Sequence, residues 1–552
     1  MKTMRTWRTL RAATFGLLTI SLSLALASAQ TYTKLYTWPE DTRNDTGIGL
    51  AGIMAQGQDG NLYGTIGDDN ANAAGSAFQM TTAGKFTRIY AFCQLTTCAD
   101  GSGPWGGLSL GKDGNLYGTT TGGGTVRAGT AFRMTPTGTL VTLFNYDNKT
   151  DGAAPWYPLL QGVDGNFYAA STSVYAGDYG AFSKITATGT QKTLVDFNYT
   201  NGNNPNLPTQ ATDGLFYGTA LSGGSKGLGV AYKITPAGKI TVLHNFIGYP
   251  TDGTNPIGVL TQGNDGAFYG VTYAGGAKNL GSVFKITSTG VLTILHSFAG
   301  YPADGTWPRS GLILGSDGNF YGTTSRGGKT NNGMLYRITP AGVLTILYSL
   351  CSQANCTDGF GTSTPIMQHT NGKFYGSTSG NSLGGSYLYS LNAGLTPFTR
   401  LVTRSGKVGT VVGLLGQGFT TVNGVSFNGV AATFKFVSDT YITATVPAGA
   451  LTGAITVKSP TATLKSDRIF LVTPQVKSIA PASGKVGTKV TITGVSLKQT
   501  TNVTIGGKPA TFTVVSDTQL TATVAAGAKT GAVSVTTAGG VANSPTKFTV
   551  TP

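Results

Sequence analysis

Carboxylates are the groups that general acid–base catalysis and metal binding use most often, and this sequence holds only 22 of them in 552 residues. The one glutamate is Glu40, and most aspartates recur at fixed places in a repeated pattern. Six aspartates begin an Asp-Gly-x-(Leu/Phe)-Tyr motif: Asp59, Asp113, Asp164, Asp213, Asp265 and Asp317. Aspartates in such turns usually accept hydrogen bonds from their own backbone, so we interpret them as turn residues rather than catalytic groups.

The other groups that could perform chemistry are equally sparse. The sequence has three histidines, His244, His296 and His369. The first two occupy equivalent repeat positions two residues before Phe246 and Phe298, which indicates a framework role rather than part of a Ser-His-Asp arrangement. Calcium on the repeated Asp-Gly-Asn turns is an alternative, although these turns lack the dense alternation of oxygen ligands of a dedicated calcium loop. We therefore predict no catalytic residue, no metal site and no cofactor.

The four cysteines fall in two matching segments, Cys93-Gln-Leu-Thr-Thr-Cys98 and Cys351-Ser-Gln-Ala-Asn-Cys356, each followed by an Asp-Gly pair. A zinc site would need histidines or further cysteines nearby, and neither segment has them. Matched pairs at one spacing are typical of disulfides in exported proteins. We predict that Cys93 bonds Cys98 and that Cys351 bonds Cys356.

Aromatic side chains are the best candidates for ligand binding. Apart from Trp7 and Trp38, each tryptophan lies beside the Asp-Gly-x-x-Pro segment between two repeats, and two tyrosines precede the same segment. These five residues are Trp105, Trp156, Trp307, Tyr249 and Tyr301. On equivalent segments their rings would converge on one face and could stack on sugar rings. The alternative is that they are wedges packed between adjacent repeats.

A repeat of 49 to 54 residues positions these groups: the Asp-Gly motif recurs six times, and a seventh, variant copy starts at Asn371. Within residues 311–350, four short apolar runs are separated by turns at Ser316–Asn319, Gly327–Gly328 and Pro340–Gly342. Four consecutive strands are typical of a propeller blade. The sequence therefore predicts an all-β fold that begins with a seven-bladed β-propeller over residues 30–396.

The two ends of this repeat region complement each other. The seventh repeat lacks an outer strand, whereas the strand-like segment Tyr32–Trp38 precedes the first repeat and resembles the outer strand Val242–Phe246. An open strand edge is a liability, and closing the ring removes it. We predict that Tyr32–Trp38 pairs with Tyr387–Leu391 and completes the seventh blade.

The repeat is similar to that of a known family. Asp-Gly-Asn-Leu-Tyr-Gly at residues 59 and 113, the Gly-Gly pairs near the middle of each repeat, and Ile-Thr-Pro-Ala-Gly at residue 338 resemble the "choice-of-anchor tandem repeat GloVer-containing" proteins of environmental bacteria. The resemblance covers residues 32–396. It implies an exported protein, and it brings no assigned activity. Members often carry a C-terminal sorting anchor, of which this sequence has no sign.

Residues 397–552 are a tandem duplication. Ser405–Thr410 (Ser-Gly-Lys-Val-Gly-Thr) recurs at Ser483–Thr488, and the Val-Ser-Asp-Thr at residue 437 recurs at residue 515, both at an offset of 78. Short alternating strands predict two immunoglobulin-like β-sandwiches over residues 397–473 and 474–552. The repeated elements resemble IPT/TIG domains, which implies spacer or adhesion modules.

The N-terminus and the charge distribution indicate export and a basic tail. Residues 1–29 have basic residues, an apolar stretch from Ala12 to Leu26 and Ala27-Ser28-Ala29, the pattern of a signal peptide, and no later stretch could span a bilayer. Of the net charge of +16, most lies in residues 397–552, with 14 basic and three acidic residues. We predict a secreted, cell-surface or periplasmic protein, with an extracellular glycan or anionic wall polymer as the candidate partner and no nucleic acid. The alternative is that the scattered lysines of the tail only keep an exported protein soluble.

Two functions are compatible with these features. We favour a noncatalytic binding or adhesion protein whose propeller binds a glycan and whose sandwiches act as spacer or attachment modules. The alternative is an extracellular polysaccharide hydrolase or lyase on the same scaffold. The fold does not separate the two, because propellers host both kinds of function.

Overall fold

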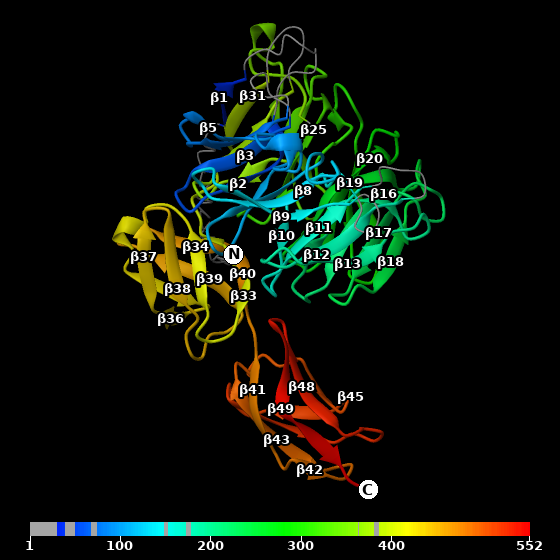
Figure 1. Cartoon of the computed structure of the whole chain (residues 1–552), viewed down its shortest axis with the longest axis vertical. Coiled ribbons are helices and arrows are strands. Elements are labelled where there is room, and N and C mark those ends of the chain that lie inside the picture. The colour runs from blue at the N-terminus through cyan, green and yellow to red at the C-terminus, as the bar shows by residue number, and fades with distance from the viewer. Residues whose placement is uncertain are drawn as a thin grey trace, which may run out of the picture.

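The computed structural model of the chain describes residues 30–38, 50–67, 74–147, 153–172, 178–362, 364–379 and 386–552. Regular structure in these residues is almost entirely strand (Figure 1). The helical segments among them are three 3₁₀ turns, η1 (Thr96–Cys98), η2 (Ala354–Cys356) and η3 (Phe419–Thr421). The predicted all-β class is therefore confirmed. The predicted signal peptide and Glu40 lie outside the described residues.

Seven antiparallel sheets follow one another through the described part of the chain up to Asn392, and we call them repeat sheets 1 to 7. Repeat sheets 1 to 3 hold, in hydrogen-bonded order, β2 (Leu50–Gln56), β3 (Leu62–Ile66), β4 (Ser76–Met80) and β5 (Phe86–Ala91); β6 (Leu108–Leu110), β7 (Leu116–Thr120), β8 (Thr130–Met134) and β9 (Leu140–Asn145); β10 (Leu160–Gln161), β11 (Phe167–Ser171), β12 (Ala181–Ile185) and β13 (Gln191–Asp196).

Repeat sheets 4 to 6 extend the same order of strands. They hold β14 (Asn203–Pro205) and β15 (Thr209–Gln210), both paired with β16 (Phe216–Ser222), then β17 (Val230–Ile234) and β18 (Ile240–Asn245); β19 (Gly253–Gln262), β20 (Phe268–Gly275), β21 (Ser282–Ile286) and β22 (Leu292–Ser297); β24 (Ile313–Leu314), β25 (Phe320–Thr324), β27 (Met334–Ile338) and β28 (Leu344–Ser349). Beside sheet 6, β23 (Gly305–Thr306) pairs with β26 (Arg326–Gly327).

Repeat sheet 7 joins the two ends of the repeat region. It holds β29 (Met367–Gln368), β30 (Phe374–Ser377), β31 (Tyr387–Asn392) and, as its outer strand, β1 (Thr31–Thr37). The register runs from Thr31 opposite Asn392 to Thr37 opposite Tyr387. The predicted pairing of the N-terminal segment with Tyr387–Leu391 is therefore confirmed, because the chain end supplies the strand that the seventh repeat lacks.

An Asp-Gly hairpin connects the first two strands of a repeat sheet. In sheet 1, Asp59 Oδ1 accepts a hydrogen bond from the Asn61 amide at 3.1 Å, and Oδ2 accepts one from the Tyr63 hydroxyl at 2.9 Å. Gly60 takes a left-handed φ of 77°, which favours glycine. The turn therefore satisfies its own backbone at the entrance to β3.

The second strands are buried on both faces. Every residue of β3, β7, β11 and β25 is buried, so each strand needs cover from a neighbouring sheet on each side. The hairpin tyrosine supplies part of this cover by stacking on the next sheet. Three such pairs have ring centroids 3.9 to 4.0 Å apart: Tyr117 with Phe167, Tyr217 with Phe268, and Tyr269 with Phe320.

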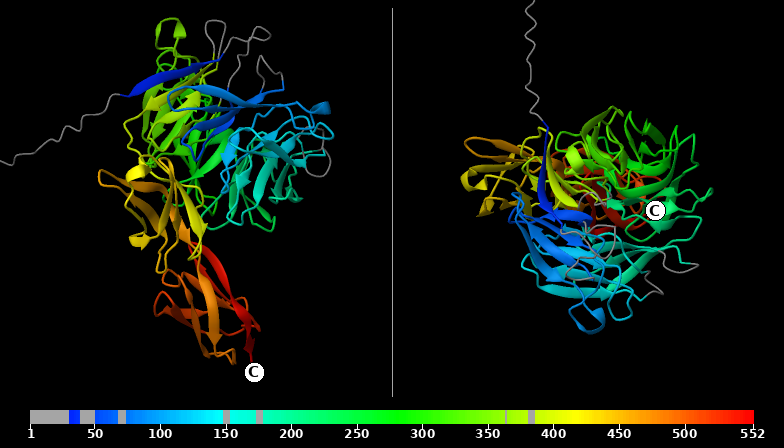
Figure 2. Two further views of the ribbon diagram at one scale, coloured as in Figure 1. Left: turned by 60° about the vertical axis from the view of Figure 1, so that its left-hand side comes forward. Right: turned by 90° about the horizontal axis from the view of Figure 1, so that it is seen from above.

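Glutamines at the ends of five first strands also join consecutive sheets. Gln161, for example, accepts a hydrogen bond from the Lys112 amide of the preceding sheet at 2.9 Å, and Gln210 accepts one from the Val163 amide. The same contact joins the last sheet to the first, because the Thr370 amide donates to Gln56 at 3.1 Å and Gln56 Nε2 donates back to the Thr370 hydroxyl at 2.7 Å. Sheets 1 and 7 lie side by side (Figure 2, right).

After the repeats come two units with the same strand order. In the first tail unit, β32 (Arg400–Leu401), β34 (Val411–Leu415), β38 (Tyr441–Thr445) and β37 (Phe434–Ser438) form one sheet; β33 (Ser405–Gly406), β40 (Thr463–Val472), β39 (Gly453–Lys458), β35 (Gly424–Phe427) and β36 (Val430–Ala432) form the other. The second tail unit repeats this order with β41 (Gln475–Ala480), β43 (Lys489–Val495), β47 (Gln519–Thr523) and β46 (Thr511–Val514), and with β42 (Ser483–Gly484), β49 (Gly540–Val550), β48 (Gly531–Thr537), β44 (Asn502–Ile505) and β45 (Lys508–Pro509).

The first tail unit rests on the Asp-Gly hairpins of the repeat sheets, and the second lies farther out (Figure 1). Thr440 donates a hydrogen bond to the Gln58 carbonyl at 2.7 Å, and Arg468 donates one to the Gln262 carbonyl at 2.7 Å. These contacts attach the unit to sheets 1 and 5, on both sides of the repeat region.

The hairpin of sheet 7 departs from the Asp-Gly motif, and its His369 contacts the hairpin of sheet 1. His369 is 1% exposed; its Nε2 lies 2.9 Å from the Gly60 carbonyl and its Nδ1 accepts from the Asn371 amide at 3.1 Å. This arrangement requires a neutral ring with the proton on Nε2. Burial, followed by the nearby Arg400 charge, lowers the pKa of His369 to about 4.

Gln56→Ala should lower the free energy of unfolding by about 1 to 3 kcal/mol, because it leaves the buried Thr370 amide without its acceptor. Urea unfolding followed by far-UV circular dichroism measures the change. Gln58→Ala, two residues along in the half-exposed turn, is the matched control and should have a smaller effect. Equal effects of the two substitutions would contradict the closing role of Gln56.

His369 should make stability depend on pH below neutrality. Its pKa in the folded chain is about 4 against an ordinary 6.5, so the unfolded chain binds the proton first as the pH falls. The contribution of His369 to the free energy of unfolding is complete above pH 6.5 and is lost progressively toward pH 4, by about 3 kcal/mol at most. The stability advantage of the wild type over His369→Ala should shrink by this amount between pH 7 and pH 4, measured by urea unfolding. A constant difference would show that the pKa of His369 is the same in the folded and the unfolded chain.

Candidate functional site

The five aromatic residues predicted to bind ligand all lie on connections that lead into the first strand of a repeat sheet, and all are exposed. The exposed fractions are 39% for Trp105, 48% for Trp156, 38% for Trp307, 60% for Tyr249 and 57% for Tyr301. Trp38, by contrast, is 2% exposed and packs beside Phe78 and Phe86. The connections therefore hold their rings at the surface, where the rings keep an accessible apolar area.

The structure brings together two of the three tryptophans. Trp105 and Trp156, from the connections into sheets 2 and 3, have ring centroids 6.0 Å apart with the planes inclined at 31°. Trp105 rests on Gly67, where a Cβ atom would lie 2.4 Å from the indole ring. A glycine is needed at this position because the indole occupies the space of a side chain.

Trp307 belongs to a different cluster, which includes residues that the sequence analysis missed. Its ring lies 6.3 Å from that of Tyr273, nearly parallel at 19°, and the Arg309 guanidinium lies 5.5 Å from the Tyr273 centroid. Tyr273 stands just before the Gly275–Gly276 pair, and this position next to the mid-repeat loop was the available signal. Tyr199, 47% exposed on the connection into sheet 4, was also missed.

Buried aspartates hold the connections in place. Asp252 Oδ1 accepts hydrogen bonds from the amides of Ile247 at 2.9 Å and Gly248 at 2.7 Å, and Oδ2 lies 2.8 Å from His244 Nε2. Asp304 repeats this arrangement with His296 at 2.7 Å. The two histidines are thus bound to the loop aspartates, as their predicted framework role requires.

In two other repeats a tyrosine replaces the histidine. Tyr90 donates to Asp100 and Tyr348 donates to Asp358, each at 2.8 Å. Burial, together with the Asp358 carboxylate, raises the pKa of Tyr348 to about 12, so the phenol keeps the proton that it donates. In these four repeats the loop aspartate is therefore bonded to a ring at the same strand position, and either histidine or tyrosine provides that ring.

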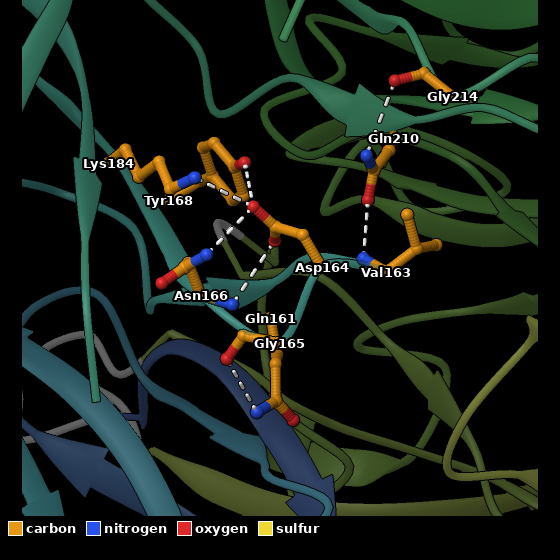
Figure 3. Close-up of polar contacts among 9 residues, drawn as sticks. All are labelled: Gln161, Val163, Asp164, Gly165, Asn166, Tyr168, Lys184, Gln210 and Gly214. Carbon is orange, nitrogen blue, oxygen red and sulfur yellow. Dashed lines mark hydrogen bonds and ion pairs between the residues drawn. The ribbon is translucent and has the colours of Figure 1, made fainter. Parts of the chain in front are cut away.

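The aspartates of the hairpin motif are likewise occupied by structural hydrogen bonds. Asp164 accepts from the Asn166 amide and side chain, the Tyr168 hydroxyl and Lys184 Nζ, at 2.8 to 3.1 Å (Figure 3). Partial burial alone raises the pKa of Asp164, but the hydrogen bonds outweigh it and lower the pKa below its ordinary value. Asp164 therefore stays ionised as a turn acceptor rather than poised as an acid or base.

Both predicted disulfides are present, Cys93 with Cys98 and Cys351 with Cys356. Each closes a loop that contains a 3₁₀ turn, η1 or η2, in a connection between two sheets. Short covalent loops of this kind restrict the connections that precede sheets 2 and 7.

In the described ranges no group of three or more His, Cys, Asp or Glu side chains is placed to hold a metal ion. Among the same residues, no helix has the length and apolar character needed to cross a bilayer.

Comparison with protein families decides where the chain belongs. The model of the Gloeobacter/Verrucomicrobia repeat matches residues 24–207 and 157–389, which together make up more than half of the sequence. The chain belongs to the Gloeobacter/Verrucomicrobia repeat family. The IPT/TIG domain model matches residues 474–550, the second tail unit of this family member. The resemblance drawn from the repeat motif is therefore confirmed, and so is the resemblance to IPT/TIG domains for residues 474–550.

Individual proteins add little to the family assignment. No curated protein matches this chain. Similar solved structures include a surface glycan-binding protein from Prevotella bryantii (20% identity, 26% of this chain and 38% of that chain, TM-score 0.21). They also include PQQ-bound aldose sugar dehydrogenase from Streptomyces coelicolor (14% identity, 66% of this chain and 98% of that chain, TM-score 0.35). A third is a fungal alcohol oxidase with copper (13% identity, 81% of this chain and 100% of that chain, TM-score 0.43). These likenesses carry no argument about function.

Asp252→Ala should destabilise the repeat protein more than Asp265→Ala. The Asp252 side chain is 5% exposed and its loss leaves two loop amides and His244 without an acceptor, whereas the Asp265 side chain is 38% exposed and water can take its place. We expect a difference of about 2 kcal/mol or more in the free energy of unfolding, measured by urea denaturation. Equal losses would contradict an anchoring role for Asp252.

Proposed function

We propose that this protein is an exported, noncatalytic binding protein whose exposed aromatic rings bind a glycan. The observation that carries the proposal is the display of five rings, 38 to 60% exposed, on connections of the same kind. Flat apolar rings held by a rigid frame can stack on the apolar faces of sugar rings at little cost in side-chain entropy.

The proposed frame is a seven-bladed β-propeller over residues 30–396. Seven consecutive repeat sheets among the described residues, the pairing of β1 with β31, and the Gln56–Thr370 contact between the last sheet and the first support it. A closed ring would bring the equivalent connections onto one face. This face lies opposite the Asp-Gly hairpins on which the first tail unit rests, so the tail leaves it open.

The tail is proposed to consist of two immunoglobulin-like sandwiches, residues 397–473 and 474–552, that act as spacer or attachment modules. The shared strand order and the parallel pairing of β33 with β40 and of β42 with β49 support this view. Secretion or display at the cell surface agrees with the two disulfides, which persist in oxidising compartments.

Retention on insoluble polysaccharides tests the binding function. Trp105→Ala and Trp156→Ala should each weaken binding by about 1 kcal/mol, or roughly fivefold in Kd, because each removes a stacking ring. Phe436→Ala is the matched control, since Phe436 is 47% exposed on the first tail unit, and it should bind as the wild type does. The same samples should release no sugar product from the polysaccharides.

Three outcomes would contradict the proposal. A large fall in melting temperature with unchanged retention would make the tryptophans wedges, since truncation of a buried Trp costs roughly 3 to 5 kcal/mol. Release of soluble sugars would favour the alternative of a polysaccharide-acting enzyme. Retention that is unchanged in the tryptophan variants and disappears with added salt would place the ligand on the basic tail.

A further inference from the structure

A cavity of about 530 Å³ lies where the first tail unit meets the repeat sheets. The first strand of every repeat sheet, or the residues beside it, contributes to its wall. Residues of β32, β34 and β40 from the first tail unit, together with Val402 and Arg404 between β32 and β33, complete the lining. Its volume is in the range of pockets that bind small organic molecules.

Four charged side chains line this cavity among the described residues, and all four come from the first tail unit: Arg400, Arg404, Asp467 and Arg468. We call them the arginine cluster. Three guanidinium groups thus face one carboxylate. Asp467 Oδ2 accepts from Arg400 Nε at 3.2 Å, and Arg468 Nη1 donates to the Gln262 carbonyl. Arg404 Nε is buried and has no hydrogen-bond partner.

The cluster carries more positive charge than its surroundings neutralise. Burial lowers the pKa of Arg468 to about 10, and repulsion from Arg404 and Arg400 acts in the same direction. Burial also lowers the pKa of Arg404. His369, which the Arg400 charge influences, is itself held neutral and adds no further positive charge. Like charges gathered in a partly buried site are costly unless an anion joins them.

The rest of the wall determines what kind of anion would fit. Apolar side chains from the first strands and their neighbours predominate, among them Met54, Leu108, Leu159 and Leu312. A ligand that fills this space therefore needs an organic body as well as a negative end. A guanidinium presents parallel N–H donors that match the two oxygens of a carboxylate.

We propose that the cavity binds a small organic acid, with its carboxylate on the arginine cluster and its body against the first strands of the repeat sheets. Arg404 is the principal donor, because its Nε has no partner within the protein. The site is separate from the aromatic rings of the connections and does not rest on the proposed glycan function. An acidic sugar and an apolar carboxylic acid share this chemistry.

Calorimetric titration of the full mature chain tests the proposal with two acids, glucuronate and benzoate, and their neutral counterparts, glucose and benzyl alcohol. At least one acid should bind and raise the melting temperature, and its neutral counterpart should not. Binding of glucuronate alone identifies an acidic sugar as the source of the carboxylate, and binding of benzoate alone identifies an apolar acid.

Arg404→Gln should weaken binding of that acid by about tenfold or more, because a charged hydrogen-bond donor is lost. Lys435→Gln removes the same charge from an exposed position of the same unit and should leave the affinity unchanged. If Arg404→Gln does not fold, Arg404→Lys provides the test, since it keeps the charge, loses the paired donors and should also bind more weakly.

Any of four results would overturn the proposal. These are no binding of either acid to the wild type, equal binding of the acid and its neutral counterpart, equal binding of inorganic phosphate and the acid, and an Arg404 variant that binds as the wild type does.

Discussion

Burial of the second strand on both faces is the constraint on which the repeat region depends. A strand such as Leu62–Ile66 has no exposed face, so a single sheet cannot be stable by itself and must pack between two others. The hairpin tyrosines and the first-strand glutamines make this packing directional, because each joins one sheet to a particular neighbour. Because sheets 1 and 7 are in contact through Gln56 and Thr370, the first and the last sheet also have a neighbour on each side.

The same packing explains why the connections can display large rings. Aspartates such as Asp252 and Asp304 anchor the backbone of these connections. Each accepts hydrogen bonds from two loop amides and is also bonded to a histidine ring. A side chain that projects from such a loop does not have to contribute to the core. Tyr249 and Tyr301, on the connections that Asp252 and Asp304 anchor, can therefore remain 60% and 57% exposed without the loss of order that an unanchored loop would bring.

The basic tail has two electrostatic parts. Most of its charge is carried by lysines spread along the strands and turns, such as Lys435 and Lys508, which are exposed to solvent and screened by salt. The arginines at 400, 404 and 468 instead gather at the junction with the repeat sheets, where burial lowers the pKa of Arg404 and Arg468. Arginine suits this junction because it holds its charge when partly desolvated and donates in fixed directions.

The sequence by itself determined the elements that are local or repeated. The Asp-Gly hairpins, the two disulfides and the 78-residue duplication could be predicted because turn chemistry, cysteine spacing and periodicity act over short distances or recur. The pairing of β1 with β31 was also predictable, because a count of strands showed one missing and one to spare. The motif likewise indicated that His244 and His296 belong to the framework.

Only the tertiary structure decided which of these residues meet. The contact of Trp105 with Trp156, the support from Gly67, and the cluster of Trp307 with Tyr273 join residues from separate strands or sheets. The repeat pattern predicts that rings on equivalent segments share a face, but it does not show which of them touch. The arginine cluster is the clearest case, because Arg404 and Arg468 are 64 positions apart and look like ordinary basic residues until the first tail unit places them against the first strands of the repeat sheets. Burial and proximity are properties of the packed chain, and they alone turn a scattered charge into a site.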